Sequence, residues 1–572
     1  MLNKEFIFCS SVIFVSNITF VQNNFMRLKA FFLCVFAASS LTSFAQKTAS
    51  VNNGIDRPKL VIGIVVDQMR WDFLYRYYDR YGEGGFKRLI KRGFSFENTM
   101  LPYTPAVTAA GHTCLFTGSI PALHGIVGND WVEKNTGDTL YCTGDKTVQS
   151  VGTWSPAGKM SPRNMLVTTV GDELRQATNF KSRVYGIALK DRGGIVAAGH
   201  TANAAYWMDD STGNWISSTY YMQQLPQWVQ QMNAEKLPDA FLSKPWNLLR
   251  DPEQYDQSIP EDSSYARAGS YRITYSFPHT VNTNGGKNYL GLRATPFGNT
   301  ITLDFAERLI RNEHLGATGQ TDMLCISLSS TDYVGHAFGP QSREVEDTYL
   351  RLDKELEDFF SMLDQKFGKD QYLLFLSADH GAGSPPGFLQ DENIPGGLLA
   401  GKAMLKEFNE ALYARYGVKD LLQNYYEYQF FFNRRKINSA QINLVDAEQF
   451  VVDLLQKKSE VLTAFSYDQL DRQVLPEFLR KKYENSYFPK RSGDIQMVLK
   501  PGYTETYAKG TDHGSAYAYD AHIPLLFYGW NIKPGKTNRE TYMTDVAPTI
   551  AALLHIQMPS GSVGKVLGEV MK

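Results

Sequence analysis

Carboxylate, imidazole and hydroxyl side chains follow several apolar segments of this chain, at the points where those segments break into glycine-rich or polar turns. The ends of parallel strands meet at one edge of an α/β sheet, where such side chains can surround a pair of divalent metal ions. A hydroxyl in the same group indicates a nucleophile for the hydrolysis of a phosphate ester. The residues concerned are Asp67, Thr108, Asp332, His336, Asp379, His380 and His513.

A first set of candidate metal ligands lies in SSTDYVGHAFGP and in KGTDHGS. Asp332 and His336 stand four positions apart, so one helical turn would point both side chains the same way. With His513 they supply one carboxylate and two imidazoles, a three-ligand zinc site that keeps positions open for substrate and water. A DxxxH pair alone is a weak signal, because such pairs often occur by chance.

A second set combines two carboxylates, one imidazole and the threonine. Asp379 and His380 are adjacent in LLFLSADHGAG, Asp67 ends LVIGIVVD, and Thr108 begins TAAGH. A lone aspartate at a strand end is more often a helix cap than a ligand, so the assignment depends on all the segments together. His112, four positions after Thr108, is expected to pack or to bond the backbone rather than to bind metal.

Three further residues could hold the phosphate group. A monoester dianion has one more charged non-bridging oxygen than a diester, and Lys190 and Arg192 in ALKDRGG can offer it an ammonium and a guanidinium. Asn129 in VGNDW is a neutral donor for another oxygen. These donors lead us to favour phosphate monoesters as substrates. The alternative is that the KDR segment is a charged surface loop.

The elements that must position these residues alternate between strands and helices. Residues 59–66, 323–328, 372–377 and 523–528 are predicted to be buried strands, and residues 84–93, 108–117, 302–311, 344–367 and 544–554 helices. This alternation predicts an α/β fold with a mostly parallel central sheet covered by helices on both faces. The α/β domain is expected at residues 57–570, with insertions at about 195–300 and 390–505 that project over one end of the sheet.

Composition limits the partners. The 572 residues carry a formal net charge of −1, so no bulk field attracts nucleic acid or an anionic membrane. We expect small phosphate esters to be the partners, no nucleic acid, and a monomer.

The N-terminal segment predicts export. From Met26 the chain has a basic start, an apolar stretch and a small-residue cleavage site before Gln46. We interpret residues 1–45 as an upstream extension plus a signal peptide, which predicts a periplasmic or secreted protein with no stable membrane anchor after cleavage. An uncleaved anchor is the alternative.

The order D…T…DxxxH…DH…H resembles that of the alkaline phosphatase superfamily, and the likeness runs from about Leu60 to the C-terminus. Asn129, Lys190 and Arg192 are similar to the phosphate-binding residues of its threonine-nucleophile, phosphate-irrepressible (PafA-type) alkaline phosphatases. The resemblance implies two Zn²⁺ ions. One would be held by Asp332, His336 and His513, and the other by Asp67, Thr108, Asp379 and His380.

The function that this resemblance implies is that of an exported zinc-dependent alkaline phosphatase, which hydrolyses phosphate monoesters through a phospho-threonine intermediate on Thr108. One alternative is a phosphodiesterase or nucleotide pyrophosphatase of the same superfamily. Another is a non-catalytic binding protein on this scaffold. A sulfatase would need a cysteine or serine in a CxPxR-type context, and TPAVTAAGH has neither.

Overall fold

The computed structural model describes residues 55–261, 264–505 and 508–571. The predicted extension and signal peptide at residues 1–45 lie outside the described residues. Residues 57–572 form one compact unit, and the following description concerns that unit.

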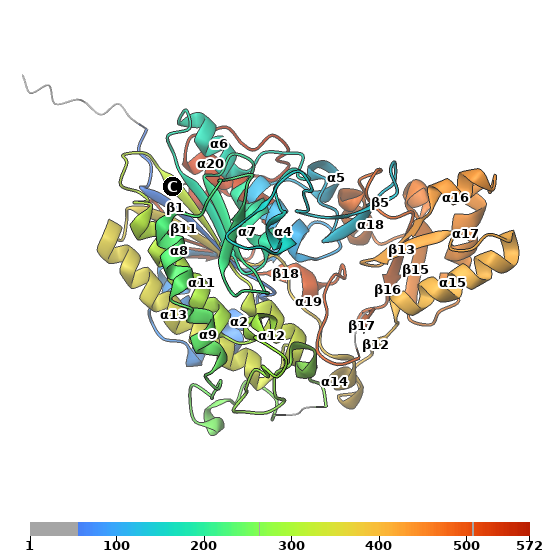
Figure 1. Cartoon of the computed structure of the whole chain (residues 1–572), viewed down its shortest axis with the longest axis horizontal. Coiled ribbons are helices and arrows are strands. Elements are labelled where there is room, and N and C mark those ends of the chain that lie inside the picture. The colour runs from blue at the N-terminus through green and yellow to red at the C-terminus, as the bar shows by residue number, and fades with distance from the viewer. Residues whose placement is uncertain (1–54, 262–263, 506–507, 572) are drawn as a thin grey trace, which may run out of the picture. The chain divides into compact units, whose positions relative to one another are not determined.

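A sheet built on five adjacent parallel strands forms the centre of this unit (Figure 1). Their order is β11 (Tyr372–Ser377), β1 (Leu60–Val66), β10 (Asp322–Leu328), β7 (Val184–Ala188) and β8 (Ala204–Met208), and each neighbouring pair is parallel. Every residue of β1 and β10 is buried. A strand buried on both faces needs a continuous apolar sequence, which the β-branched residues of β1 supply. The predicted mostly parallel α/β fold is therefore confirmed.

Further strands extend the sheet at both edges. Among the described residues the complete order is β20-β2-β19-β11-β1-β10-β7-β8-β9-β6, and the outer strands β19 (Leu525–Gly529) and β9 (Trp215–Ser218) pair antiparallel with their inner neighbours. The remaining edge strands are β20 (Gly535–Thr537), β2 (Phe94–Phe96) and β6 (Ser150–Val151).

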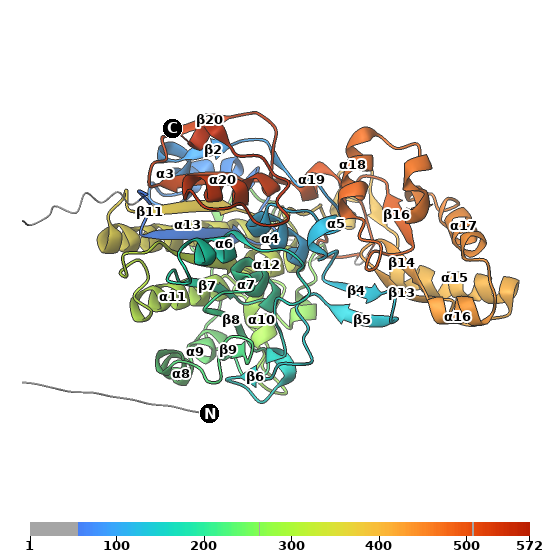
Figure 2. The same ribbon diagram turned by 90° about the horizontal axis from the view of Figure 1, so that it is seen from above.

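Helices cover both faces of the sheet (Figure 2). On one face α11 (Phe297–Asn312), α12 (Ser330–Phe338) and α13 (Arg343–Phe367) pack on one another. On the other face α7 packs on β7 and β8, and α4 packs on both α7 and α20. The bounds of these helices are α4 (Thr108–Thr117), α7 (Asp191–Ala198) and α20 (Val546–Leu553).

The predicted strand at residues 523–528 is divided at Pro524. Residues His522–Ile523 form β18, which pairs with β3 (Thr99–Met100), whereas Leu525–Gly529 form β19 in the central sheet. Proline has no backbone N–H to donate to a neighbouring strand, so the ladder is interrupted there.

Part of the range 195–300, which the sequence suggested to be an insertion, lies in the central sheet. Strands β8 and β9 fall in this range, and Trp207 and Trp215 on them are buried. Both strands are buried throughout, so they show no alternation of polar and apolar residues that would mark them in the sequence.

Residues 401–499, which we call the lobe, contain a sheet of their own (orange in Figures 1 and 2). Its antiparallel strands follow the order β13-β14-β16-β15, and α15 (Gly401–Tyr416) and α17 (Leu444–Leu455) pack against it around a separate apolar core. The strands are β13 (Leu422–Tyr426), β14 (Gln429–Phe432), β16 (Ile495–Leu499) and β15 (Val461–Ser466).

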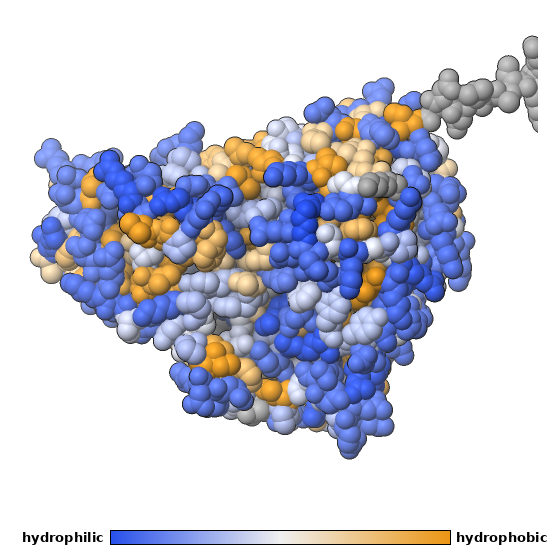
Figure 3. All heavy atoms as spheres, turned by 180° about the vertical axis from the view of Figure 1, so that it is seen from behind, coloured by the Kyte–Doolittle hydropathy of each residue, from blue (hydrophilic) through white to orange (hydrophobic). Residues whose placement is uncertain are grey.

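The face shown in Figure 3 is mostly hydrophilic, with apolar residues in small groups. In the described part of the chain, no helix combines the length and the apolar character that crossing a membrane requires.

Candidate active site

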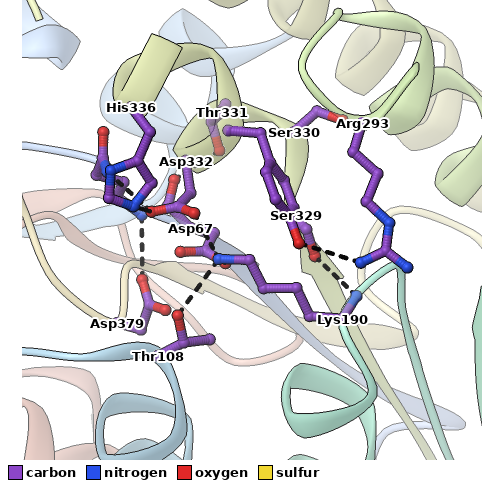
Figure 4. A network of polar contacts seen from close by, with 12 residues as sticks. Asp67, Thr108, Lys190, Arg293, Ser329, Ser330, Thr331, Asp332, His336 and Asp379 are labelled. Carbon is purple, nitrogen blue, oxygen red and sulfur yellow. Dashed lines mark hydrogen bonds and ion pairs between the residues drawn. The ribbon is translucent and has the colours of Figure 1, made fainter. Parts of the chain in front are cut away.

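Four neighbouring parallel strands bring predicted site residues to one edge of the sheet. Asp67 directly follows β1, and Lys190 comes two residues after β7. Asp332 lies on α12, which follows β10, and Asp379 comes two residues after β11. Because these strands are parallel, their carboxyl ends coincide, and the side chains point toward one another (Figure 4).

The first predicted ligand set is assembled around the Asp332 carboxylate. Asp332 and His336 lie one turn apart on α12, and Asp332 Oδ1 is 3.2 Å from His336 Nε2. His513 comes from a distant loop, and its Nε2 lies 3.6 Å from the same oxygen. One carboxylate oxygen and two imidazole nitrogens therefore converge, as a three-ligand metal site requires.

The second predicted set is fully buried. One ligand atom each from Asp67, Asp379 and His380 lies within 4.8 Å of the others. His380 Nε2 is 3.6 Å from Asp67 Oδ1 and from Asp379 Oδ2, and among the described residues none of these three atoms has a hydrogen-bond partner. Burial and the neighbouring Asp379 carboxylate raise the pKa of Asp67. A bound cation would relieve this repulsion, so the donor set fits a divalent metal.

The three histidines all present the same ring nitrogen to the carboxylates. Nδ1 of His336, His380 and His513 lies 2.8, 2.9 and 2.7 Å, respectively, from a backbone carbonyl oxygen. A carbonyl can only accept, so each Nδ1 carries a proton, and in the neutral ring the lone pair is left on Nε2. This is the arrangement by which proteins orient metal-binding histidines. Burial, together with His380 and His336, also lowers the pKa of His513, which favours the neutral ring.

His112 is not placed as a ligand. Its Nδ1 lies 2.9 Å from the carbonyl oxygen of Thr108, and its Nε2 lies 2.9 Å from the hydroxyl oxygen of Ser327. Nδ1 also lies 3.3 Å from Asp379 Oδ2, so His112 contacts a carboxylate of the second ligand set. The Thr108 contact is the backbone bond that the sequence led us to expect. The contacts tie the start of α4 to strand β10.

Thr108 is the first residue of α4, and Val107 takes its N-cap position. The helix approaches the second ligand set closely because residue 111 is glycine. A Cβ atom there would lie 2.5 Å from the backbone oxygen of Asp379. Figure 4 shows Thr108 beside Asp379, so the hydroxyl lies at the edge of this set.

Lys190 connects the two ligand sets. Its ammonium nitrogen lies 2.6 Å from Asp332 Oδ2, 2.8 Å from Asp67 Oδ2 and 3.3 Å from Thr108 Oγ1. Burial by itself favours the neutral amine, but the carboxylates of Asp332 and Asp67 prevail and raise the pKa of Lys190. A fully charged ammonium therefore lies next to the threonine hydroxyl.

Asn129 directly precedes β4 (Asp130–Glu133), and Arg192 lies in the first turn of α7. The Ala109 backbone N–H donates to Asn129 Oδ1 at 3.2 Å, which holds Asn129 against the first turn of α4, next to Thr108. Arg192 donates from Nη1 to the Tyr141 hydroxyl at 3.1 Å, and that hydroxyl donates to Asp191 Oδ1 at 2.9 Å. Tyr141 and Asp191 thus form a short relay that fixes the guanidinium.

Three residues near the site were missed in the sequence. Gln68 donates from Nε2 to Asp332 Oδ1 at 2.8 Å and from its backbone N–H to Asp379 Oδ1 at 3.1 Å. Asp512 lies with His336 and His513, and its position next to His513 in TDHG was the only available signal. Glu427, at the β13–β14 turn of the lobe, accepts the backbone N–H of Asn129 at 2.9 Å.

Comparisons with known proteins agree with this geometry. The family model described as type I phosphodiesterase / nucleotide pyrophosphatase matches residues 61–522. The chain is 48% identical to the alkaline phosphatase PhoV of Synechococcus elongatus, over 96% of this chain and 100% of that protein. It is 47% identical to the alkaline phosphatase PafA of Elizabethkingia meningoseptica, over 95% and 99% of the two chains. The crystal structure of wild-type PafA superposes with a TM-score of 0.87 at 46% identity and covers 91% of this chain and 100% of its own.

Proposed function

Because the chain belongs to the type I phosphodiesterase / nucleotide pyrophosphatase family, within the alkaline phosphatase superfamily, we propose that it is an alkaline phosphatase acting on phosphate monoesters. The observation that carries the proposal is the buried ammonium of Lys190, 3.3 Å from Thr108 Oγ1. A phosphoryl group bonded to that oxygen would place a non-bridging oxygen within reach of the charge. A monoester has one more charged non-bridging oxygen than a diester to offer to it.

The proposal includes two zinc ions. Asp332, His336 and His513 would hold one ion, and the carboxylates of Asp67 and Asp379, with His380 and Thr108, would hold the other. When bound, the ions would lower the pKa of the Thr108 hydroxyl and neutralise charge on the departing ester oxygen.

The chain's own residues then define the reaction. The oxygen of Thr108, after losing its proton to water, attacks phosphorus and forms a phospho-threonine. The bond from phosphorus to the ester oxygen breaks, and this oxygen takes a proton from water as the alcohol departs. Water then cleaves the phospho-threonine and releases phosphate. Lys190, Arg192 and Asn129 would hold the non-bridging oxygens throughout.

A second candidate is hydrolysis of phosphate diesters, which the description of the matching family favours. In a diester, an alkyl or aryl group replaces the oxygen that would meet Lys190. A buried ammonium facing that group would have no partner in the substrate, so the monoester reaction accounts better for Lys190.

We also propose export to the periplasm or the cell exterior, on the basis of the basic, apolar and small-residue pattern between Met26 and Gln46. N-terminal sequencing of the protein expressed in a Gram-negative host would test this. A mature chain that begins near Gln46 supports export, and an intact N-terminus contradicts it.

The experiment that tests the activity is a panel of matched aryl monoesters, diesters and sulfate esters. Each is assayed with the purified protein before and after chelation, and again after zinc is restored. We expect kcat/KM to be highest for the monoester, to vanish on chelation and to return with zinc. A preference for the diester or the sulfate would overturn the assignment.

A further inference from the structure

A cavity of about 770 Å³ lies directly beside the first ligand set, and it is lined by none of Thr108, Asn129, Lys190 and Arg192. Asp512 and His513 form part of its wall. The rest comes from Arg70 and Gln341, from segments around α14 (Pro386–Asp391), from the lobe, and from residues 500–504 and 515–520. The volume is of the size that holds one ring-bearing organic group.

The wall of this cavity is largely aliphatic and aromatic. Leu389, Ile394 and Leu462 contribute aliphatic side chains, and Tyr428 and Tyr519 contribute rings. Ile394 and Leu462 are each 47% exposed, an unusual position for large apolar side chains that face the same cavity. Such a surface gains from covering by a ligand of similar character.

Three residues of the same wall each have a buried polar atom without a hydrogen-bond partner among the described residues. Asp520 is only 1% exposed, and its Oδ2 accepts the backbone N–H of Ser515 at 2.8 Å, whereas its Oδ1 has no partner among the described residues. Gln341 Oε1 and Thr504 Oγ1, which also line the cavity, are likewise unpaired there. Buried acceptors of this kind are rare unless a donor from a ligand or water reaches them.

The position of the cavity indicates which part of a substrate it would take. In an in-line displacement the nucleophile and the leaving group lie on opposite sides of phosphorus. Thr108 belongs to the set of Asp67 and Asp379, so under the proposed function the alcohol departs toward the set of Asp332 and His513. His513 is shared by that set and the cavity wall.

We propose that this cavity is the binding subsite for the leaving alcohol, and that it selects monoesters whose alcohol carries an apolar or aromatic ring with a hydroxyl or amine donor. The inference rests on the proposed function. Remote contacts of this kind raise kcat/KM because their binding energy is available in the transition state.

The test compares methyl phosphate, benzyl phosphate and 3-(hydroxymethyl)benzyl phosphate, whose alcohols have similar acidity. Wild-type enzyme should prefer benzyl over methyl phosphate in kcat/KM, and the double variant Ile394→Ser/Leu462→Ser should reduce this ratio by about tenfold. Both positions are half-exposed, so the substitutions should not unfold the protein. A matched control is Val445→Ser/Val474→Ser, which removes two exposed valines outside the cavity wall and should leave the ratio as it is.

The acceptor is tested with Asp520→Asn, which keeps an oxygen for the Ser515 N–H but replaces the free acceptor by a donor. We expect the advantage of the hydroxymethyl compound over benzyl phosphate to fall by about tenfold, because a donor then faces a donor. Calorimetry measures the affinities of the three esters for zinc-loaded Thr108→Ala, with and without the cavity substitutions. The ratios of these affinities test the cavity without turnover.

The outcomes separate the two proposals. If wild-type enzyme hydrolyses none of the three esters, the proposed function fails, while the binding ratios still decide on the cavity. If the esters are hydrolysed but the ratios in turnover and binding are equal in wild type and in all cavity variants, the cavity is not the alcohol subsite and the phosphatase assignment stands.

Discussion

The ammonium nitrogen of Lys190 lies 3.3 Å from the hydroxyl oxygen of Thr108, and both side chains are buried. A positive charge next to a hydroxyl favours the ionised form of its oxygen. The Lys190 ammonium would also face a phosphoryl group bonded to that oxygen. The pair therefore joins the proposed nucleophile to the proposed phosphate site, and substitutions at the two positions should have different effects.

Replacing Thr108 by alanine should abolish nearly all turnover while leaving zinc content and melting temperature close to those of the wild type, because the carboxylates and imidazoles remain. Thr108→Ser should retain a substantial part of the activity, because it keeps a hydroxyl. Steady-state kinetics with elemental analysis provides the measurement. Full activity in the alanine variant would show that the nucleophile is water or another residue.

Replacing Lys190 or Arg192 by alanine should reduce kcat/KM for an aryl monoester by ~2–4 kcal/mol of transition-state stabilisation, as for other preorganised donors. The matched aryl diester should lose much less, because it lacks the charged oxygen that these residues would bind. Equal losses on the two substrates would show that the pair is structural. Tyr141→Phe is an informative companion, because it removes the hydroxyl that fixes Arg192 and leaves Lys190 in place.

We expect two zinc ions per chain, and we expect their removal to lower the melting temperature as well as the activity. Asp67 and Asp379 are fully buried near each other, so losing a bound cation leaves their repulsion only partly offset by Lys190. Elemental analysis and calorimetry before and after chelation measure both effects. One tightly bound metal in fully active enzyme would contradict the two-metal site.

Gln68→Leu should weaken zinc binding by about 10- to 100-fold, the usual effect of losing a residue that orients metal ligands. Its side-chain amide donates to Asp332 and its backbone N–H to Asp379, so the leucine variant loses only the first contact. Competition with a chelator gives the affinity. Gln423→Leu is a suitable control, because that side-chain amide bonds to Gly137 in a distant hairpin. Equal zinc affinities in Gln68→Leu and Gln423→Leu would show that Gln68 does not orient the metal ligands.

Glu427 should make stability depend on pH. Burial raises the pKa of Glu427 to about 8, although the N–H of Asn129 acts in the opposite direction. An unfolded chain loses this proton above about pH 4.3. The contribution of Glu427 to the free energy of unfolding is thus fully present below about pH 4.3. It is lost as the pH rises through about 8.

Denaturant unfolding of the zinc-loaded protein at several values between pH 5 and pH 9 tests this expectation. The decline in the free energy of unfolding should be smaller in Glu427→Gln, which keeps an acceptor for Asn129 but does not titrate. Parallel curves for the two proteins would contradict the assignment.

The parts of the site that the sequence predicts are those attached to buried strands. Asp67 and Asp379 follow continuous apolar segments, and such segments have few alternatives to a central parallel strand. The bounds of β11 and α4 were accordingly predicted to the residue.

The parts that the sequence does not predict depend on contacts between distant segments. Gln68 adopts a left-handed conformation, with φ of +65°, and places its amide on a carboxylate 264 positions away. Glu427 reaches Asn129 from the lobe, across 298 positions. Neither contact can be recognised from the neighbouring sequence, because glutamine and glutamate are common in solvent-exposed turns.

The lobe lies between His380 and His513 in the chain, and this placement determines when the metal centre can be completed. A chain that emerges from a ribosome or an export channel N-terminus first presents Asp67, Thr108, Lys190 and Asp332 early. It then presents Asp379 and His380, next the whole lobe, and His513 last. A nascent or truncated chain that ends before residue 513 has only one imidazole beside Asp332 in the first ligand set. Closing that set is thus one of the final events in the biogenesis of this protein, and it follows the synthesis of the lobe.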